Sequence, residues 1–407
     1  MNKKISAWML SILLASTVML NGCNFSLTAK SVPSPQSQSS ADIIQSSPEK
    51  SPSSADKSTS SQDESQSSPA QILSARSFEQ IGMFSERDGW AVIDHKLWKT
   101  SDGAQTWADI TPKDLHLSKS ASDALYVYFS SNQLGWVVDF QNKQTVYYTR
   151  DGGAEWSASK LPEPIGREYN ASGNIFINFS SSQYGFVLYT SDPAVGQMLK
   201  SLFRTKDGGA TWSRVGELTA QIASYPTGMT FLNDQVGWIT SSYHGQDKPL
   251  LYQTKDGGVI WNLQQLPAPS DHSGYADVFP PVFSSAGSPN GVLPVVWHSS
   301  SDKTFSVYAT QNGGDSWQIQ TQKSFNLAYT LYFQVLFHNG NWQTDVWNGW
   351  ELNTWLNQDK QWTAFKTNID PAGSANIDFI SPQAGYVIIH KQLFKTADFG
   401  RTWSKIN

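Results

Sequence analysis

The stretch Thr205-Lys206-Asp207-Gly208-Gly209-Ala210-Thr211-Trp212 decides how this chain folds, because close copies of it recur along the sequence. The copies span residues 100–107, 149–156, 254–261, 310–317 and 396–403, and a degenerate copy spans 355–362. Their closing tryptophans are 49, 56, 49, 56, 45 and 41 residues apart. Repeats of about 40–50 residues are typical of propeller blades and of solenoid units.

A second motif lies ahead of most copies and consists of a phenylalanine followed, after a short turn, by glycine and usually an aromatic residue. It occurs at Phe84…Gly89-Trp90, Phe129…Gly135-Trp136, Phe179…Gly185-Phe186, Phe231…Gly237-Trp238, Phe283…Gly291-Val292 and Phe379…Gly385-Tyr386. In the sixth unit we expect Gly340-Asn341-Trp342 to take this place, with Gly349-Trp350 as the competing interpretation. Each unit then supplies four strands, and seven units predict an all-β, seven-bladed propeller of four-stranded antiparallel blades over residues 76–407.

The Asp-Gly-Gly segment has hairpin chemistry, because Asp and Gly supply the left-handed conformations that tight turns require. The carboxylate can accept N–H groups of the turn, and the tryptophan can cover the hairpin. We therefore expect structural roles for Asp102, Asp151, Asp207, Asp256, Asn312 and Asp398 and for Trp107, Trp156, Trp212, Trp261, Trp317 and Trp403. The asparagine at 312 suits a turn and would not suit a general acid.

This pattern resembles the Asp-box, or bacterial neuraminidase repeat, which occurs in sialidases, xyloglucan-cleaving glycosidases and sortilin-type receptors. Together with the Phe…Gly-aromatic motif, it is most similar to the photosystem II assembly/stability factor propellers, over essentially all of residues 77–407. The resemblance implies a non-enzymatic protein that binds a protein partner. The arginine patch expected of that family is not evident here, so we do not carry over a photosystem partner.

Composition excludes several functions. With 29 Lys and Arg against 34 Asp and Glu, the formal net charge of −5 gives no electrostatic footprint for a phosphate backbone, so we expect no nucleic-acid binding. A sialidase needs three arginines to clamp a carboxylate, and only Arg167 falls in a loop suited to binding. The sequence has no Walker loop, Gly-x-Ser-x-Gly or His-Glu-x-x-His motif. We predict no enzyme activity, cofactor or metal, with a glycoside hydrolase as the less favoured alternative.

The N-terminus predicts a lipid anchor. Lys3 and Lys4 precede an apolar stretch, and Leu20-Asn21-Gly22-Cys23 resembles the lipobox of bacterial lipoproteins. That resemblance implies that residues 1–22 are a signal peptide and that Cys23, the single cysteine, carries the lipid. The predicted location is the outer side of the bacterial cytoplasmic membrane, with the bilayer bound through acylated Cys23.

A polar tether follows the predicted anchor. Residues 31–70 hold sixteen Ser and five Pro, a composition that cannot offset ordering entropy by burying apolar area. We therefore predict a disordered linker over residues 23–75, which serves as a spacer between the bilayer and the propeller.

Propeller geometry predicts where a partner binds. The turns between strands 1 and 2 should share a face with the Asp-boxes, and the 2→3 and 4→1 loops should share the opposite face. Variable loops on a repeated scaffold are where recognition usually resides. Candidate residues on the 2→3/4→1 face are Arg167, Tyr169, Tyr243, His244, Trp297, His298, His95 and His390. A protein partner is the first hypothesis, and a carbohydrate or cell-wall polymer is the alternative.

Aromatic residues outside the repeats leave two interpretations open. Exposed rings stack on sugars or anchor a protein partner, whereas buried rings fill a core. For Trp342, Trp347, Trp350 and Trp355 of the irregular sixth unit we favour the core, and for Tyr243 and Trp297 the sequence does not decide. It also leaves open whether the ring closes by packing alone or whether residues 71–76 add a strand.

Overall fold

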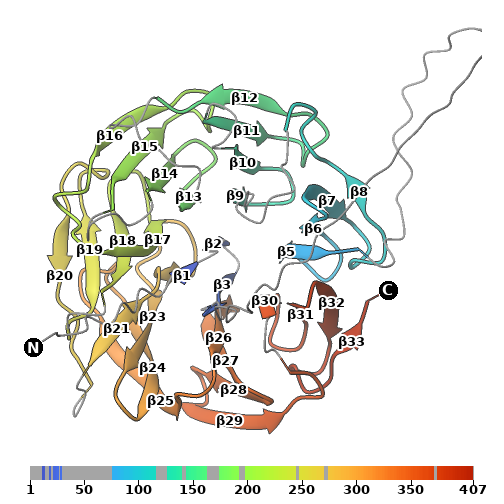
Figure 1. The fold of residues 1–407 in the computed structure, drawn as a ribbon, viewed down its shortest axis with the longest axis vertical. Helices are drawn as coiled ribbons and strands as arrows, with labels where there is room; N and C mark the ends of the chain where they lie inside the picture. The colour runs from blue at the N-terminus through green and yellow to red at the C-terminus, as the bar shows by residue number, and fades with distance from the viewer. Residues whose placement is uncertain are drawn as a thin grey trace, which may run out of the picture.

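The structure, a computed structural model, contains seven antiparallel sheets arranged in a ring (Figure 1). It describes residues 76–406 except 116–125, 140–143, 163–173, 192–197, 244–246, 270–273 and 371–373, together with four short strands between residues 12 and 29. The seven-bladed all-β propeller predicted from the repeats is confirmed. Among the described residues, no helix has the length and apolar character needed to cross a membrane.

The first four blades each contain four strands in the order of the chain. Blade 1 is β5 (Phe78–Met83), β6 (Gly89–Ile93), β7 (Lys96–Thr100) and β8 (Ala108–Asp109). Blade 2 is β9 (Tyr126–Phe129), β10 (Gly135–Asp139), β11 (Thr145–Thr149) and β12 (Ser157–Lys160). Blade 3 is β13 (Ile175–Phe179), β14 (Gly185–Thr190), β15 (Lys200–Thr205) and β16 (Ser213–Glu217). Blade 4 is β17 (Tyr225–Phe231), β18 (Gly237–Ser242), β19 (Leu250–Thr254) and β20 (Asn262–Gln264).

The remaining blades complete the ring. Blade 5 is β21 (Tyr275–Val278) with β22 (Val282–Phe283), β23 (Gly291–His298), β24 (Asp302–Thr310) and β25 (Gln318–Asn326). Blade 6 is β26 (Leu331–His338), β27 (Asn341–Asn348), β28 (Glu351–Leu356) and β29 (Gln361–Lys366). Blade 7 is β30 (Ser374–Phe379), β31 (Gly385–Ile389), β32 (Gln392–Thr396) and β33 (Ser404–Lys405).

Four further strands lie near the N-terminus. They are β1 (Ile12–Leu13), β2 (Val18–Met19), β3 (Gly22–Ser26) and β4 (Thr28–Ala29). The β1 strand pairs with β4, and β3 pairs with β2 and with the inner strand β26, where Cys23 is opposite Val335. These pairings make the blade 6 sheet six-stranded.

The Phe…Gly motif is a packing device between strands 1 and 2. Phe179 pairs with Gly185, and a Cβ atom added to Gly185 would lie 2.3 Å from the Phe179 ring. Glycine is required there because the ring occupies that space. In blade 1 the residue paired with Gly89 is Met83, so our placement of Phe84 in this role was wrong by one residue. Methionine fills the space that phenylalanine fills in the other blades, which concealed the register.

Blades 5 and 6 depart from the repeat in different ways. In blade 5 the inner strand is interrupted between β21 and β22 at Pro280 and Pro281, which have no N–H to donate to a sheet. In blade 6 the turn between β26 and β27 contains Gly340, as expected, and the Gly349-Trp350 pair instead forms the turn between β27 and β28.

Side chains of the inner strands join neighbouring blades. Tyr128 Oη donates to Phe179 O at 3.2 Å, and Asn178 Oδ1 accepts from Phe231 N at 2.9 Å. Gln334 donates to Phe379 O at 3.0 Å and also accepts from Phe379 N. Because these phenylalanines hold the Phe…Gly position, the same backbone point is bound in blade after blade. The inner rim therefore has a repeated polar connection in addition to apolar packing.

The ring closes without a strand shared between its two ends in the described part of the chain. The sheets of blades 1 and 7 are separate, and hydrogen bonds between residues of the two blades connect them. Met83 N donates to Asp378 Oδ2 at 2.6 Å, and Ile81 N donates to Asn376 Oδ1 at 3.2 Å. Phe78 N donates to Lys391 O at 2.9 Å. Closure thus uses the same kind of side-chain connection as the other blade junctions.

Candidate functional site

The Asp-boxes and the 1→2 turns lie on one face, which we call the box face. In each box the backbone N–H of the residue after the Asp or Asn, such as Gly208 or Gly257, donates to a carbonyl of the 1→2 turn in the same blade, Gln183 and Gln235 in these two cases. The same bond recurs in blades 1, 2, 5 and 7. The 2→3 and 4→1 loops therefore lie at the opposite ends of the strands, on what we call the loop face.

Within each box the acid is bound to the turn itself. Asp207 Oδ1 accepts from Thr211 N at 2.8 Å and from Thr205 Oγ1 at 2.8 Å, and Asp207 Oδ2 accepts from Thr211 Oγ1 at 2.5 Å. Burial would raise the pKa of Asp207, but these hydrogen bonds outweigh it and lower the pKa. The pKa values of Asp102, Asp151, Asp256 and Asp398 are lowered through equivalent bonds. A carboxylate held ionised in this way is poorly suited to act as a general acid.

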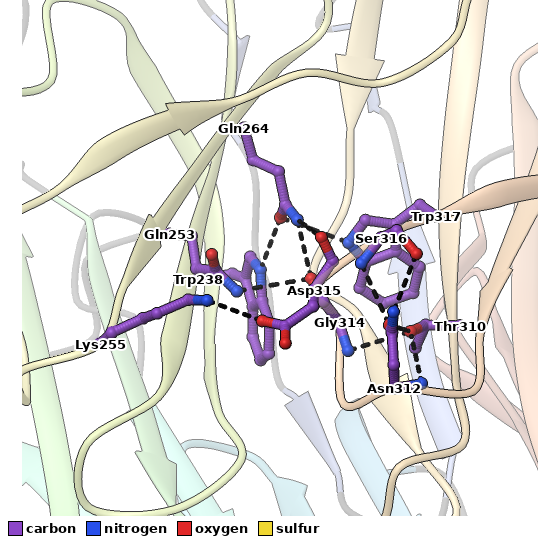
Figure 2. A network of polar contacts seen from close by, with 10 residues as sticks. All are labelled: Trp238, Gln253, Lys255, Gln264, Thr310, Asn312, Gly314, Asp315, Ser316 and Trp317. Carbon is purple, nitrogen blue, oxygen red and sulfur yellow. Dashed lines mark hydrogen bonds and ion pairs between the residues drawn. The ribbon is translucent and has the colours of Figure 1, made fainter.

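Asn312 performs the same task in blade 5 (Figure 2). Thr310 Oγ1 donates to Asn312 Oδ1 at 2.7 Å, and Asn312 Nδ2 donates to Ser316 Oγ at 2.9 Å. Gln264, the last residue of β20 in blade 4, donates to Gly314 O at 2.7 Å. This glutamine connects the box of blade 5 to the preceding blade.

Two tryptophans share that glutamine. Trp238 Nε1 and Trp317 Nε1 donate to Gln264 Oε1 at 3.0 and 3.3 Å (Figure 2). Lys255 Nζ lies 2.7 Å from Asp315 Oδ1 across the same blade junction. The other box tryptophans are buried except Trp156, which is partly exposed. The box face is thus occupied by contacts that hold blades together.

Of the predicted loop-face residues, three lie outside the described part of the chain and two lie in tight 2→3 turns. Tyr243, Trp297 and His298 lie in or directly after second strands. Arg167, Tyr169 and His244 lie outside the described residues. His95 and His390 lie in two-residue 2→3 turns, in which both central residues have positive φ, as a type I′ hairpin requires. His95 Nδ1 lies 3.3 Å from Glu79 Oε2, whereas His390 is exposed.

Trp297 does not lie on the surface, and this corrects its place among the candidates. Its side chain is 0 % exposed and packs in a cluster with Trp238, Tyr308 and Trp317. The physical reason is the length of β23, which continues to His298, so that Trp297 is still inside the sheet where the second strands of blades 1 to 4 and 7 have ended. His298, the next residue, occupies the edge.

An acid-centred cluster lies where blades 4 and 5 meet on the loop face. Asp277 of β21 accepts hydrogen bonds from Ser242 Oγ of β18 and pairs with His298 Nε2 at 2.8 Å. The Tyr275 ring stacks on His298, with centroids 4.3 Å apart. Burial, aided by the charge of Asp277, raises the pKa of Tyr275 to about 12. We call Ser242, Tyr275, Asp277, His298 and Lys303 the Asp277 cluster.

The order of groups in this cluster argues against a nucleophilic triad. In such a triad the histidine lies between serine and acid, because it must accept the serine proton. Here the carboxylate of Asp277 lies between Ser242 and His298. Burial lowers the pKa of Lys303, and the charge of Asp277 partly opposes that shift. Asp277 therefore lies between its two neighbours, an order of groups that differs from that of a nucleophilic triad.

Exposed apolar side chains extend the loop face from blade 4 to blade 6. Tyr243 is 38 % exposed and its ring is stacked with Tyr225 at 6.1 Å. Tyr329 and Trp350 are 50 % and 53 % exposed, and Leu327 is 37 % exposed. We call Tyr243, Leu327, Tyr329 and Trp350 the aromatic surface. Lys303 Nζ donates to Tyr329 O at 2.9 Å, which links this surface to the Asp277 cluster.

The backbone under the aromatic surface is fixed. A Cβ atom added to Gly349 would lie 3.2 Å from the Tyr329 ring, so that ring rests against the turn that carries Trp350. Trp350 O accepts from Thr367 N at 2.9 Å. The rings are therefore presented on ordered backbone, which reduces the entropy lost when a partner binds.

Our expectation for the tryptophans of blade 6 was confirmed for three of the four. Trp342, Trp347 and Trp355 are buried, but Trp350 is exposed because it lies in a turn and not in a strand. Sequence reasoning did not identify Leu327 and Tyr329. The signal available for them was a Tyr and a Leu in the short loop between residues 326 and 331, outside every repeat.

Within the described ranges, no group of three or more His, Cys, Asp or Glu side chains is arranged to hold a metal ion. The buried carboxyl groups have partners inside the fold. Asp378 binds Met83 N, and Asp345 accepts from Thr354 Oγ1 and Gln343 Nε2, both at 2.7 Å. Burial raises the pKa of Asp345 to about 6, against the effect of these two hydrogen bonds.

Comparison with known proteins confirms the resemblance given by the repeats. Residues 113–268 match the model of the family described as photosynthesis system II assembly factor YCF48. No curated protein sequence matches the chain.

The solved structures to which the chain is similar share little sequence identity with it. The β-propeller domain of Vanderwaltozyma polyspora Nup133 is 9 % identical, with 83 % of this chain and 99 % of that chain covered and a TM-score of 0.44. The α-L-arabinanase of Penicillium chrysogenum is 12 % identical, with 57 % and 80 % covered and a TM-score of 0.34. Prolyl oligopeptidase B of Galerina marginata is 11 % identical, with 82 % and 50 % covered and a TM-score of 0.46.

Proposed function

We propose that this chain is a non-enzymatic propeller that binds a protein partner through its loop face. The observation that carries the proposal is the aromatic surface, in which Tyr243, Tyr329 and Trp350 are exposed on ordered backbone. Large aromatic side chains contribute most of the binding energy in many protein interfaces, and their enrichment on one face marks an interaction site. The family match over residues 113–268 supports the non-enzymatic part of the proposal.

The arrangement of charge supports the same function. The polar groups of the Asp277 cluster lie beside the exposed rings, as polar groups lie beside the apolar core of a protein interface. Because Asp277 and His298 are already paired, a partner does not have to neutralise an isolated charge there.

The test is crosslinking with mass spectrometry on intact cells, followed by affinity measurements with the partner found. We expect Tyr329→Ala and Trp350→Ala to weaken binding at least tenfold each, because each removes a large exposed ring. His390→Ala, on the same face but in blade 7, is the control and should change the affinity less than twofold. Equal affinity for all three variants would refute the proposal.

A carbohydrate or cell-wall polymer is the second candidate ligand. The exposed rings of Trp350 and Tyr329 favour it, because sugar rings stack on aromatic faces as readily as protein side chains do. Binding of the purified protein to a glycan array, lost in Trp350→Ala, would favour this candidate. Partner capture that is insensitive to added sugars would favour a protein.

We also propose that the protein is held at the outer side of the bacterial cytoplasmic membrane by a lipid on Cys23. The sequence Leu20-Asn21-Gly22-Cys23 supports this, and several acyl chains make such anchoring durable. Metabolic labelling with a radioactive fatty acid tests it. Labelling should be lost in Cys23→Ser, and label that persists in this variant would refute the proposal.

A further inference from the structure

Four Asn-Gly pairs lie in the described part of the propeller, at residues 290–291, 312–313, 339–340 and 348–349. In such a pair the glycine nitrogen can attack the side-chain amide of the asparagine, because glycine has no Cβ atom to hinder the approach. The attack requires a glycine N–H without a partner and a backbone that is able to rotate. The four pairs differ in both respects, so the structure indicates which of them reacts.

The pair in the box of blade 5 is held by hydrogen bonds on all sides. Asn312 Oδ1 accepts from Thr310 Oγ1 at 2.7 Å and from Ser316 N at 3.1 Å. The N–H of Gly313, which would have to attack, donates to Pro289 O at 2.9 Å. A reaction at Asn312 would break the bonds that organise the box, so this pair is protected.

Two further pairs are held by their neighbours. Asn290 O, the carbonyl of the peptide that would rotate, accepts from Ser284 N at 3.1 Å. In the other pair Asn348 Oδ1 is buried, and a Cβ atom added to Gly349 would lie 3.2 Å from the Tyr329 ring. The backbone at these two pairs is therefore restrained against the rotation that ring closure requires.

The fourth pair, Asn339-Gly340, forms the two-residue turn between β26 and β27, and both residues are exposed. A Cβ atom added to Gly340 would meet nothing within 4 Å, and Gly340 N donates to no described residue. In the other six blades a box N–H binds the 1→2 turn, but in blade 6 Asn357 N donates to Trp342 O, beyond the turn. This exposed tip is therefore free to open locally.

A histidine lies beside the amide of this pair. His338, the last residue of β26, is exposed, and its Nε2 lies 2.9 Å from Asn339 Nδ2. The hairpin register fixes this position, since His338 pairs with Asn341 across the turn. An amide nitrogen has to accept a proton before it leaves as ammonia, and histidine is the side chain that supplies a proton most readily near neutral pH.

We infer that Asn339 is a site of spontaneous deamidation and that His338 is its general acid. When the turn opens, Gly340 N attacks Asn339 Cγ, the C–N bond of the amide breaks, and ammonia leaves with a proton from His338. The proton that Gly340 N loses returns to the imidazole. Water then opens the cyclic imide at either carbonyl and gives aspartate or isoaspartate. The product has a new carboxylate beside His338 on the box face, and isoaspartate adds a methylene to the backbone of the turn.

The experiment follows the four pairs in one sample of the full chain. The protein is incubated at pH 7.5 and 37 °C and digested, and mass spectrometry measures the conversion of each asparagine to the acid. We expect Asn339 to react at least tenfold faster than Asn290, Asn312 and Asn348. In a second sample, unfolded in urea, the four rates should differ less than threefold, because the restraints described above are then removed.

The variant His338→Gln tests the general acid, because glutamine is polar but has no proton to supply near neutral pH. It should slow the reaction of Asn339 at least threefold and leave Tm and the other three rates unchanged. A rate at Asn339 no higher than at the other three pairs in the folded chain, or a tenfold advantage that persists in urea, would overturn the site. An unchanged rate in His338→Gln would overturn the role of His338. None of these measurements depends on a partner of the loop face.

Discussion

The hairpins between strands 3 and 4 occupy the same position in blades 3 and 6, but different hydrogen bonds stabilise them. In blade 3 the turn is organised around Asp207, which accepts hydrogen bonds from Thr205 and Thr211. In blade 6 the turn has no such acid at its centre, and Asp359 N and Lys360 N both donate to Leu356 O at 3.1 Å. The acidic residue of blade 6 that is compared with Asp207 is Asp345, which is buried inside the blade.

Because of this difference, the pKa values of the two acids are shifted in opposite directions. The hydrogen bonds around Asp207 favour the ionised form, and its pKa is lowered. Burial of Asp345 favours the neutral form, and its pKa is raised to about 6. The regular blades are therefore stabilised by ionised acids at the surface, whereas blade 6 pays for an ionised acid in its interior above that pH.

The largest expected effect comes from the indole that connects a regular blade to the next. Trp136 stacks on Phe179 with centroids 3.6 Å apart, and its Nε1 donates to Gly208 O at 2.9 Å. We expect Trp136→Ala to lower the free energy of unfolding by about 3–5 kcal/mol, because it leaves a cavity and an unpaired carbonyl. Urea denaturation measures it.

The exposed tryptophan of blade 6 is the matched control for that variant. Trp350→Ala should change the free energy of unfolding by about 0.5 kcal/mol or less, since its ring is half in water. Similar losses for the two variants would show that blade 6 depends on its turn aromatic as much as the regular blades depend on theirs.

The next largest expected effect is the change of the unfolding free energy with pH that the protonation of Asp345 causes. Its folded pKa is raised, so its contribution to stability is fully present below about pH 4 and is lost as the pH rises to about 6. A shift of about two units corresponds to a loss of about 3 kcal/mol. Asp345→Asn should remove this loss, because the Gln343 amide can turn to present Oε1, which has no partner, to the new amide.

The measurement is the difference in unfolding free energy between the wild-type chain and Asp345→Asn at pH 4.5 and at pH 7.5. The variant should gain relative to the wild-type chain as the pH rises. A gain of the opposite sign, or a difference that does not change with pH, would show that Asp345 is not a buried proton acceptor.

Replacing a glycine should lower the stability by a smaller amount, and the amount should differ between blade 3 and blade 6. Gly185→Ala places a Cβ atom 2.3 Å from the Phe179 ring and should cost about 2 kcal/mol. Gly340→Ala in blade 6 meets nothing within 4 Å but has a φ of +77°, so we expect about 1 kcal/mol from backbone strain. Thermal unfolding of both variants tests whether the regular blade is the more tightly packed, and an equal decrease in Tm would argue against it.

The same contrast explains which parts were predictable from the sequence. The number of blades and the turn positions followed from the boxes, because each box is local and its residues bind one another. Even the degenerate blade was located, since Trp355 and Trp362 retain the positions of a pair on neighbouring strands. Local chemistry is readable when the interacting residues are a few positions apart.

The candidate site was less predictable because it joins residues distant in the sequence. Asp277 meets Ser242 from another blade and His298 from another strand, and none of these pairs has a repeat to identify it. Trp297 and His298 differ in exposure because of the length of β23, which the spacing of motifs does not give. Trp350 became exposed because it lies in a turn whose place the sequence left open.

The smallest expected effect concerns the box acid itself, with blade 5 as a natural control. Asn312 already serves in a box, so Asp207→Asn should cost about 1 kcal/mol or less at pH 7, whereas Asp207→Ala should cost more because Thr211 N and Oγ1 lose their acceptor. The lowered pKa of Asp207 means that its stabilising effect is present at neutral pH and is lost as the pH falls through that lowered pKa. The cost of Asp207→Asn should therefore shrink in acid, opposite in sign to the pH effect of Asp345. Chemical denaturation at pH 7 and pH 3.5 measures both, and a cost of Asp207→Asn that grows in acid would mean that the carboxylate is not what organises the turn.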